Sequence, residues 1–170
     1  MHPVIFEIFE GLPRGGPGSC ESTQRAYRAL GALPPEPRIL DIGCGPGVQT
    51  LDLAEISEGP ITAVDIHPPF IATLREAAQA RGFGERITPI VGDMAGLTFE
   101  SGSFDLLWSE GAIFVIGLEK GLRDWRRLLT PGGGMAFTEV AWLRRDPPRE
   151  LAEFWHAEYP AITTVEQNLA

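Results

Sequence analysis

The segment whose residue types and spacing could carry chemistry is ILDIGCGPGVQT, residues 39–50. A short apolar run delivers Asp41, and Gly43, Gly45 and Gly47 then occupy alternate positions before a helical pattern begins. Glycines there allow a tight turn and let the backbone come close to a ligand. The N-terminus of the following helix presents free N–H groups and a partial positive charge, which suits a carboxylate or phosphate. An ordinary tight turn needs one or two glycines, so the segment predicts a ligand-binding loop.

The position of the third glycine bears on the choice of ligand. A dinucleotide-binding fingerprint reads G-x-G-x-x-G, whereas the third glycine here is Gly47 and position 48 is valine. Asp41 precedes Gly43 by two residues and would repel the pyrophosphate of NAD. The spacing therefore favours a ligand with a positively charged amino group, and an NAD-dependent oxidoreductase is kept as an alternative.

A sheet is needed to position these residues, and the chain alternates strand and helix patterns. Strands are predicted at 38–43, 61–66, 87–92, 104–109 and 135–143. Helices are predicted at 4–10, from Ser19 or Ser22 to about Leu30, at 47–56, 68–81, 118–129 and 148–156, and after a capping box of Thr163 and Glu166. Strands that alternate with helices in this way predict βαβ units and an open, doubly wound parallel sheet.

Composition limits the partners that such a domain would have. The chain has 170 residues, about the length of one domain, and carries 14 Lys+Arg against 23 Asp+Glu for a net charge of −9. This charge disfavours nucleic acid, and the chain has no apolar run of the ~20 residues that span a bilayer. The start MHPVIFEIFE lacks the pattern of a secretory signal, and two cysteines and three histidines show no metal-ligand spacing. We expect a cytoplasmic protein with no metal, membrane or nucleic-acid partner.

Several motifs together resemble one known family. D-x-G-x-G-x-G at the end of a strand is similar to motif I of the class I S-adenosylmethionine-dependent methyltransferases, and the resemblance runs from about residue 36 to 143. Gly92-Asp93-Met94, SFDLLWSEGAI and LLTPGGGMAF are similar to the family's later motifs. WSEGAIFVIG, together with the upstream LPRGGPGS, further resembles the small-molecule methyltransferases of the type 11 group. The resemblance implies methyl transfer from S-adenosylmethionine to a small-molecule acceptor, with S-adenosylhomocysteine as the product.

The resemblance also implies roles for individual residues. Asp65 ends the second strand, where the family's acid binds both ribose hydroxyls, and Asp93 matches the acid that meets the adenine amino group. Ile66 and Met94 would supply apolar faces for the purine, and Gln49 is placed to reach the methionine carboxylate. The complete set of expected cofactor-binding residues is Asp41, Gly43, Cys44, Gly45, Gln49, Asp65, Ile66, Asp93, Met94, Ser109 and Glu110.

Methyl transfer by in-line displacement depends mainly on alignment of the two substrates, and a base is needed only where the acceptor must lose a proton. Glu110, at the end of the fourth strand, is the one candidate for a direct catalytic role. Three interpretations of it stay open: a base, a charge that stabilises the sulfonium, or a solvated helix-capping acid.

The resemblance predicts a Rossmann-like sheet with strand order 3-2-1-4-5 and two segments. Residues 1–35 form an N-terminal helical segment, in which 12–19 is either a lid over the cofactor or a surface loop; residues 36–170 form the cofactor-binding domain. The family's sheet normally has seven strands that end in an antiparallel hairpin. We expect the chain to lack that hairpin, to be the front part of a longer protein, and to leave the outer edge of its fifth strand uncovered. A cofactor-binding domain or fragment without turnover is a further alternative; the acceptor and any homo-oligomer are left open.

Overall fold

The computed structural model describes residues 3–12 and 14–169. Residues 1–2, 13 and 170, which belong to the predicted segments 1–35 and 36–170, lie outside the described residues. The chain divides after Thr138 into two compact units. No helix within the described ranges is both long enough and apolar enough to cross a membrane.

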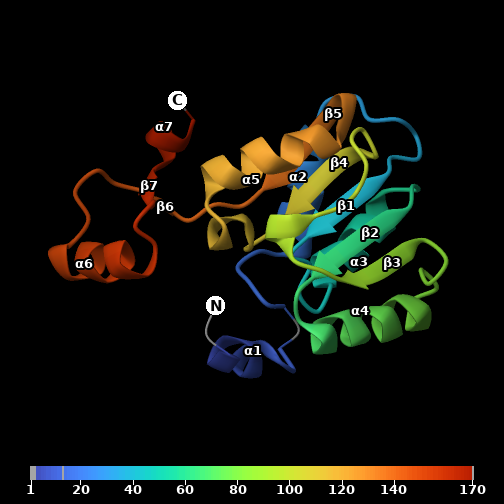
Figure 1. The fold of residues 1–170 in the computed structure, drawn as a ribbon, viewed down its shortest axis with the longest axis horizontal. Coiled ribbons are helices and arrows are strands. Elements are labelled where there is room, and N and C mark those ends of the chain that lie inside the picture. Colours follow the sequence, from blue (N-terminus) through green and yellow to red (C-terminus); the bar gives the residue numbers. More distant parts are fainter. Residues whose placement is uncertain (1–2, 13, 170) are drawn as a thin grey trace. The chain divides into compact units, whose positions relative to one another are not determined.

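The first unit is built on a five-stranded parallel sheet in the order β3-β2-β1-β4-β5 (Figure 1), which confirms the predicted fold class and strand order. The strands are β1 (Ile39–Ile42), β2 (Ile61–Asp65), β3 (Ile87–Val91), β4 (Phe104–Ser109) and β5 (Leu129–Phe137). All four residues of β1 are buried, as a central strand covered on both faces requires.

Within the described residues, this unit has five helices and three short 3-10 turns. They are α1 (Pro3–Phe9), α2 (Cys20–Ala29), α3 (Val48–Ile56), α4 (Pro68–Ala80) and α5 (Leu118–Trp125), with η1 (Met94–Gly96), η2 (Ile113–Val115) and η3 (Arg126–Leu128). The predicted start of α2 is confirmed, because Ser19 and Ser22 form a capping box there. Two prolines occupy the first turn of α4, where the missing N–H groups have no helical partner to lose.

Two apolar layers hold the helices to the sheet. Neighbouring residues of β1 point to opposite faces, so Ile39 packs in one layer and Leu40 in the other. The first layer includes residues of α2, α3 and α4 around Trp108, and the second includes residues of α5 and the short turns around Trp125. The sheet is thus doubly wound. The loops that follow β1, β2, β3 and β4 leave the sheet at the carboxyl ends of these strands.

The fifth strand differs from the prediction. β5 begins at Leu129 and ends at Phe137, so the predicted bounds of the fifth strand, 135–143, were wrong. Leu129 pairs with Phe104 and Gly134 with Leu106, and the intervening residues form an irregularity within the strand pairing. The predicted helix 118–129 is shorter for the same reason, because η3 follows α5 and leads directly into β5.

The second unit is small. A two-residue parallel pair joins β6 (Ala141–Trp142) to β7 (Thr163–Thr164), and the helices are α6 (Arg149–Glu158) and α7 (Val165–Asn168). The last helix is capped by Thr164 and Gln167, so the prediction of Thr163 and Glu166 was wrong. The Thr163 hydroxyl donates instead to Asn168 Oδ1 at 2.6 Å.

Candidate functional site

The loop between β1 and α3 has the backbone that only glycine adopts readily. Gly43, Gly45 and Gly47 have φ values of +74°, +54° and +90°. A Cβ at Gly47 would lie 2.2 Å from a Leu74 methyl carbon, and one at Gly43 would lie 2.4 Å from the Cβ of Ala112. A Cβ at Gly45 would meet no atom of the described residues within 4 Å. Packing therefore explains two of the glycines, whereas the third leaves a side of the loop open to a ligand.

Asp65 lies at the end of β2, beside this open position. One of its carboxylate oxygens accepts a hydrogen bond from the Gly45 N–H at 2.9 Å, and the other accepts from the His67 N–H at 2.9 Å. The side chain is therefore held in place by two backbone donors. A carboxylate offers about four acceptor positions, so the half-buried Asp65 keeps capacity for two further donors such as vicinal hydroxyls.

Asp41 lies at the base of the loop and is fully buried. Its Oδ2 accepts a 2.6 Å hydrogen bond from the Thr50 hydroxyl, and its Oδ1 has no partner among the described residues. Burial raises the pKa of Asp41 to about 7; the charges of Glu110 and Asp65 add to this rise, and the Thr50 hydrogen bond opposes it. A proton or a cationic group of a ligand would stabilise this carboxyl group.

Three other predicted residues hold the loop together. The Gln49 amide donates to the Cys44 carbonyl at 2.8 Å, and the Ser109 hydroxyl donates to the Ile42 carbonyl at 3.0 Å. Burial raises the pKa of the Cys44 thiol well above its ordinary value, so this residue contributes backbone rather than a nucleophile. A contact of Gln49 with a ligand carboxylate stays a prediction.

The predicted purine-binding residues follow β2 and β3. Asp93 is exposed, and its Oδ1 accepts a 2.8 Å hydrogen bond from the Ala95 N–H at the start of η1. Met94 reaches toward the glycine loop, residues 43–47 between β1 and α3, since its Cε lies 3.1 Å from the position of a Cβ on Gly43. Ile66 is 55% exposed directly after Asp65. The apolar side chains of Ile66 and Met94 and the carboxylate of Asp93 are thus available here to a planar polar ligand.

Glu110 is enclosed by donors. Its Oε1 accepts from the Thr23 hydroxyl at 2.7 Å and from the Trp108 indole N–H at 2.9 Å, and its Oε2 accepts from Arg14 at 3.1 Å. The Glu110 side chain is 8% exposed, so the interpretation as a solvated acid does not fit. Arg14 also donates to Asp52 Oδ2 at 2.7 Å.

Sequence reasoning missed Arg14, Thr23 and Asp52 as parts of this region. Arg14 and Glu110 are 96 positions apart, and no local periodicity reports a contact over that separation. The sequence feature that could have indicated the role of Arg14 is the Gly/Pro stretch LPRGGPGS, residues 12–19, which precedes α2 and contains this arginine.

Residues 14–18 lie against the glycine loop. A Cβ at Gly15 would be 3.5 Å from Pro46, and one at Gly16 would be 3.7 Å from the Gly111 Cα. The segment therefore covers the turn after β1 and the end of β4. The lid interpretation of residues 12–19 stays a prediction.

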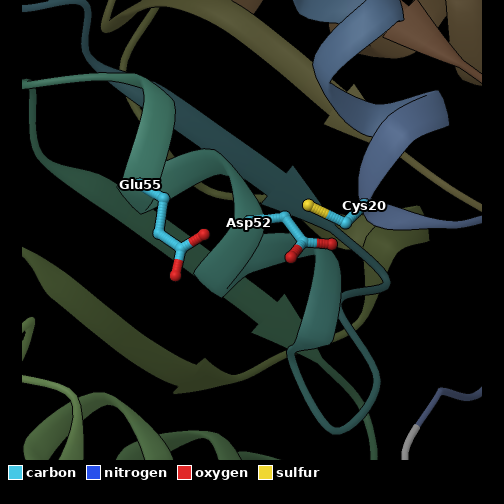
Figure 2. A group of neighbouring side chains, drawn as sticks. All are labelled: Cys20, Asp52 and Glu55. Atoms are coloured by element: carbon cyan, nitrogen blue, oxygen red, sulfur yellow. The ribbon is translucent and has the colours of Figure 1, made fainter.

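Figure 2 shows a group of three side chains with metal-ligand chemistry, one of which, Asp52, pairs with Arg14. Cys20, Asp52 and Glu55 each place one ligand atom so that all three lie within 4.8 Å of one another. Both carboxylates already pair with arginine, Asp52 with Arg14 and Glu55 with Arg81. The ion pairs account for these acids, and we assign no metal to them.

Comparisons with known proteins find similar sequences and a similar fold. A family model described as a methyltransferase domain matches residues 39–133. A malonyl-[acyl-carrier protein] O-methyltransferase of Enterobacter lignolyticus is 31% identical over 121 residues, which cover 71% of this chain and 44% of that protein. A demethylmenaquinone methyltransferase of Mycolicibacterium gilvum is 31% identical over 147 residues, which cover 83% and 59%. The chain thus spans about half the length of these two relatives.

A solved structure is similar over nearly the whole chain. It is a SAM-dependent methyltransferase from Geobacter sulfurreducens in complex with S-adenosyl-L-homocysteine, with a TM-score of 0.83 and 25% identity. The match covers 99% of this chain and 68% of that one.

Proposed function

Because the chain belongs to the methyltransferase-domain family, with the class I S-adenosylmethionine-dependent fold, we propose that it transfers a methyl group from S-adenosylmethionine to a small-molecule acceptor. The relatives favour this reaction over hydride transfer with NAD. When bound, the cofactor supplies a methyl group that its sulfonium charge has already activated. The protein then has to bind the cofactor and the acceptor, align them with each other, and exclude water from the site.

The observation that carries the proposal is the arrangement of Asp65 beside Gly45. The Asp65 carboxylate is oriented by two backbone N–H groups and retains acceptor capacity, and the adjacent Gly45 leaves open space. Vicinal ribose hydroxyls would use that capacity, with Ile66 and Met94 against the purine and Asp93 near its amino group. The residues present therefore fit the cofactor.

The charge around the loop fits a cation better than a pyrophosphate. Glu110 and Asp65 both act on buried Asp41 and raise its pKa, whereas Arg14 lowers it. Together with the ion pair of Arg14 and Asp52, these interactions involve four carboxyl groups and one guanidinium. S-adenosylmethionine carries two cationic groups, a sulfonium and an ammonium, and only one anionic group, its carboxylate. NAD would instead place a doubly negative pyrophosphate beside these acids.

Methyl-labelled S-adenosylmethionine tests the proposal directly. The protein is incubated with labelled cofactor and a small-molecule extract, and labelled products are sought by mass spectrometry, with Asp65→Ala as the matched blank. A labelled metabolite that the blank lacks is the expected result. Calorimetry with S-adenosylhomocysteine and with NADH runs in parallel.

The failures are distinguishable from one another. Binding of S-adenosylhomocysteine without any labelled product would identify a cofactor-binding domain without turnover. Binding of NADH in place of S-adenosylhomocysteine would overturn the proposal in favour of an oxidoreductase.

A further inference from the structure

Asp41 is a fully buried acid beneath the glycine loop that has very few hydrogen-bond donors. The Thr50 hydroxyl donates to its Oδ2 at 2.6 Å, and its Oδ1 has no partner among the described residues. A carboxylate offers about four acceptor positions, and burial of the charged form is unfavourable unless donors or a cation satisfy them. The geometry around Asp41 therefore suits a neutral carboxyl group.

The backbone donors of the glycine loop are committed to other acceptors. Pro46 has no N–H, and each remaining residue of the loop donates at 2.8 to 3.0 Å to a group other than Asp41. Two of these N–H groups reach the Val64 carbonyl, one reaches the Asp65 carboxylate and one reaches the Cys44 carbonyl; the donors are, in this order, Gly43 and Cys44, Gly45, and Gly47. The loop thus leaves the second oxygen of Asp41 to a proton or to a ligand.

The charges around Asp41 also favour its neutral form. Glu110 and Asp65 oppose a further negative charge there, and Arg14 alone favours one. Arg14 is already paired with two carboxylates, at 2.7 and 3.1 Å. Burial keeps the Cys44 thiol uncharged by raising its pKa. The titratable and charged groups that act on Asp41 are thus Glu110 after β4, Asp65 at the end of β2, Cys44 in the loop, and Arg14 with its partner Asp52 on α3.

Only two combinations of charge are favourable in such a place. One is the neutral carboxyl group by itself, and the other is the carboxylate of Asp41 beside a cation. A carboxylate without a cation leaves a buried charge uncompensated, and a cation beside the neutral carboxyl group loses its solvent without gaining a partner. A cationic ligand that binds beside Asp41 should therefore take the place of the proton.

We propose that Asp41 selects ligands that carry an ammonium group by exchanging its own proton for that group. The O–H bond of the carboxyl group breaks, the proton goes to solvent, and the ammonium group compensates the carboxylate that remains. The pair of groups is neutral before and after the exchange. The ammonium group is that of the methionine part of the cofactor, so this inference rests on the proposed function. Asp41 is a specificity-determining residue and has no part in the transfer of the methyl group.

Calorimetry in buffers of different ionisation enthalpy counts the protons that leave the protein when S-adenosylhomocysteine binds. With a pKa of about 7, Asp41 is mostly protonated at pH 6.5. Binding at this pH should therefore release about 0.8 proton per ligand. The Kd should rise about fivefold between pH 7 and pH 6, because the ligand must displace the proton more often.

The matched control ligand is 5′-methylthioadenosine, which has the adenine, the ribose and a thioether sulfur but no amino acid part. It should bind without release of a proton, and its Kd should stay constant over the same pH range. Both ligands carry the ribose hydroxyls expected at Asp65, so a titration of Asp65 would affect the two alike. Equal proton release with both ligands would overturn the exchange.

Variants assign the proton to Asp41. Asp41→Asn should bind S-adenosylhomocysteine more weakly and release no proton. Thr50→Val removes the hydroxyl that stabilises the carboxylate, so proton release should extend to higher pH, and Thr50→Ser should restore the wild-type range. Glu139→Gln is the control, since burial raises the pKa of this acid of the second unit as well. Its proton release should match wild type. If Asp41→Asn does not fold, the two Thr50 variants decide.

The exchange and the proposed function fail in different ways. Binding of S-adenosylhomocysteine with the same enthalpy in every buffer would overturn the exchange and leave the proposed function intact. Absence of binding by both ligands would contradict the proposed function. The carbon-13 resonance of the Asp41 carboxyl group, followed against pH in the protein without ligand, then decides whether Asp41 holds a proton. A midpoint near pH 7 is expected, and one below pH 5 would overturn the inference.

Discussion

Thr50 donates a 2.6 Å hydrogen bond to one carboxylate oxygen of Asp41, and the second oxygen of Asp41 is buried without a partner among the described residues. A single hydroxyl does not offset the cost of burying a charged carboxylate, so burial raises the pKa of Asp41 to about 7. The glycine loop is therefore built around a carboxyl group whose charge depends on pH and on what binds beside it.

This relationship predicts that stability declines as the pH rises. Between about pH 4 and about pH 7 the unfolded chain has lost the Asp41 proton while the folded chain retains it, so the unfolded state binds fewer protons. The free energy of unfolding should fall across this window by up to about 4 kcal/mol from this group alone. Urea unfolding at a series of pH values measures the decline.

Asp41→Asn isolates the contribution of that residue. The amide oxygen can still accept from Thr50, and no proton is exchanged at this position. Glu139 also has a pKa raised by burial, so some decline should persist in the variant. A wild-type profile parallel to that of Asp41→Asn would show that Asp41 does not titrate in this range.

Much of the fold follows from local sequence patterns. Apolar runs predicted β1 to β4 within a residue or two of their observed ends, because each run is short, buried and bounded by glycine, proline or a helical pattern. The glycine loop was predicted for a similar reason, because its three glycines occupy alternate positions within one short segment. In the structure each of these glycines has a positive φ.

Contacts between distant residues were beyond such reasoning. The predicted fifth strand, 135–143, leaves out the glycine-rich residues before it, whereas pairing with β4 incorporates them into β5. Asp52 would be assigned to the solvated side of α3 by its type alone, yet Arg14 stabilises it in a buried position. Each outcome depends on a partner that chain folding brings from elsewhere in the sequence.

Replacement of Asp65 should weaken cofactor binding strongly. Asp65→Ala removes the two acceptor positions expected to bind the ribose hydroxyls, and hydrogen bonds to a charged group contribute about 1.5–3 kcal/mol each. We expect the Kd for S-adenosylhomocysteine, measured by calorimetry, to rise about thirtyfold or more. Asp146→Ala is the control, since that carboxylate is exposed in the second unit and contacts Arg144. Unchanged affinity in Asp65→Ala would disprove the ribose assignment.

Docking of α1 depends on an aromatic cluster at the start of α4. The Phe6 ring stacks on His67 with centroids 4.5 Å apart, and Glu10 contacts His67 Nε2 at 2.7 Å. Phe6→Ala should release α1, because a seven-residue helix is not stable by itself. Hydrogen exchange of the α1 amides should approach that of an unfolded peptide, while exchange in the sheet stays slow. Retained protection in α1 would show that other contacts hold it.

The two glycines on either side of Pro46 should respond differently to alanine. Gly45→Ala places a methyl group in open space at a φ of +54°, so the cost is mainly backbone strain of about 1–2 kcal/mol. Gly47→Ala adds a clash, since its Cβ would lie 2.2 Å from Leu74, and we expect a loss of about 3 kcal/mol or more. Gly45→Ala should remain folded and lose affinity for S-adenosylhomocysteine, because its methyl group occupies the side of the loop left for the ligand. Thermal unfolding and calorimetry on both variants separate the two effects; a folded Gly45→Ala with wild-type affinity would mean that the cofactor does not approach the loop at this residue.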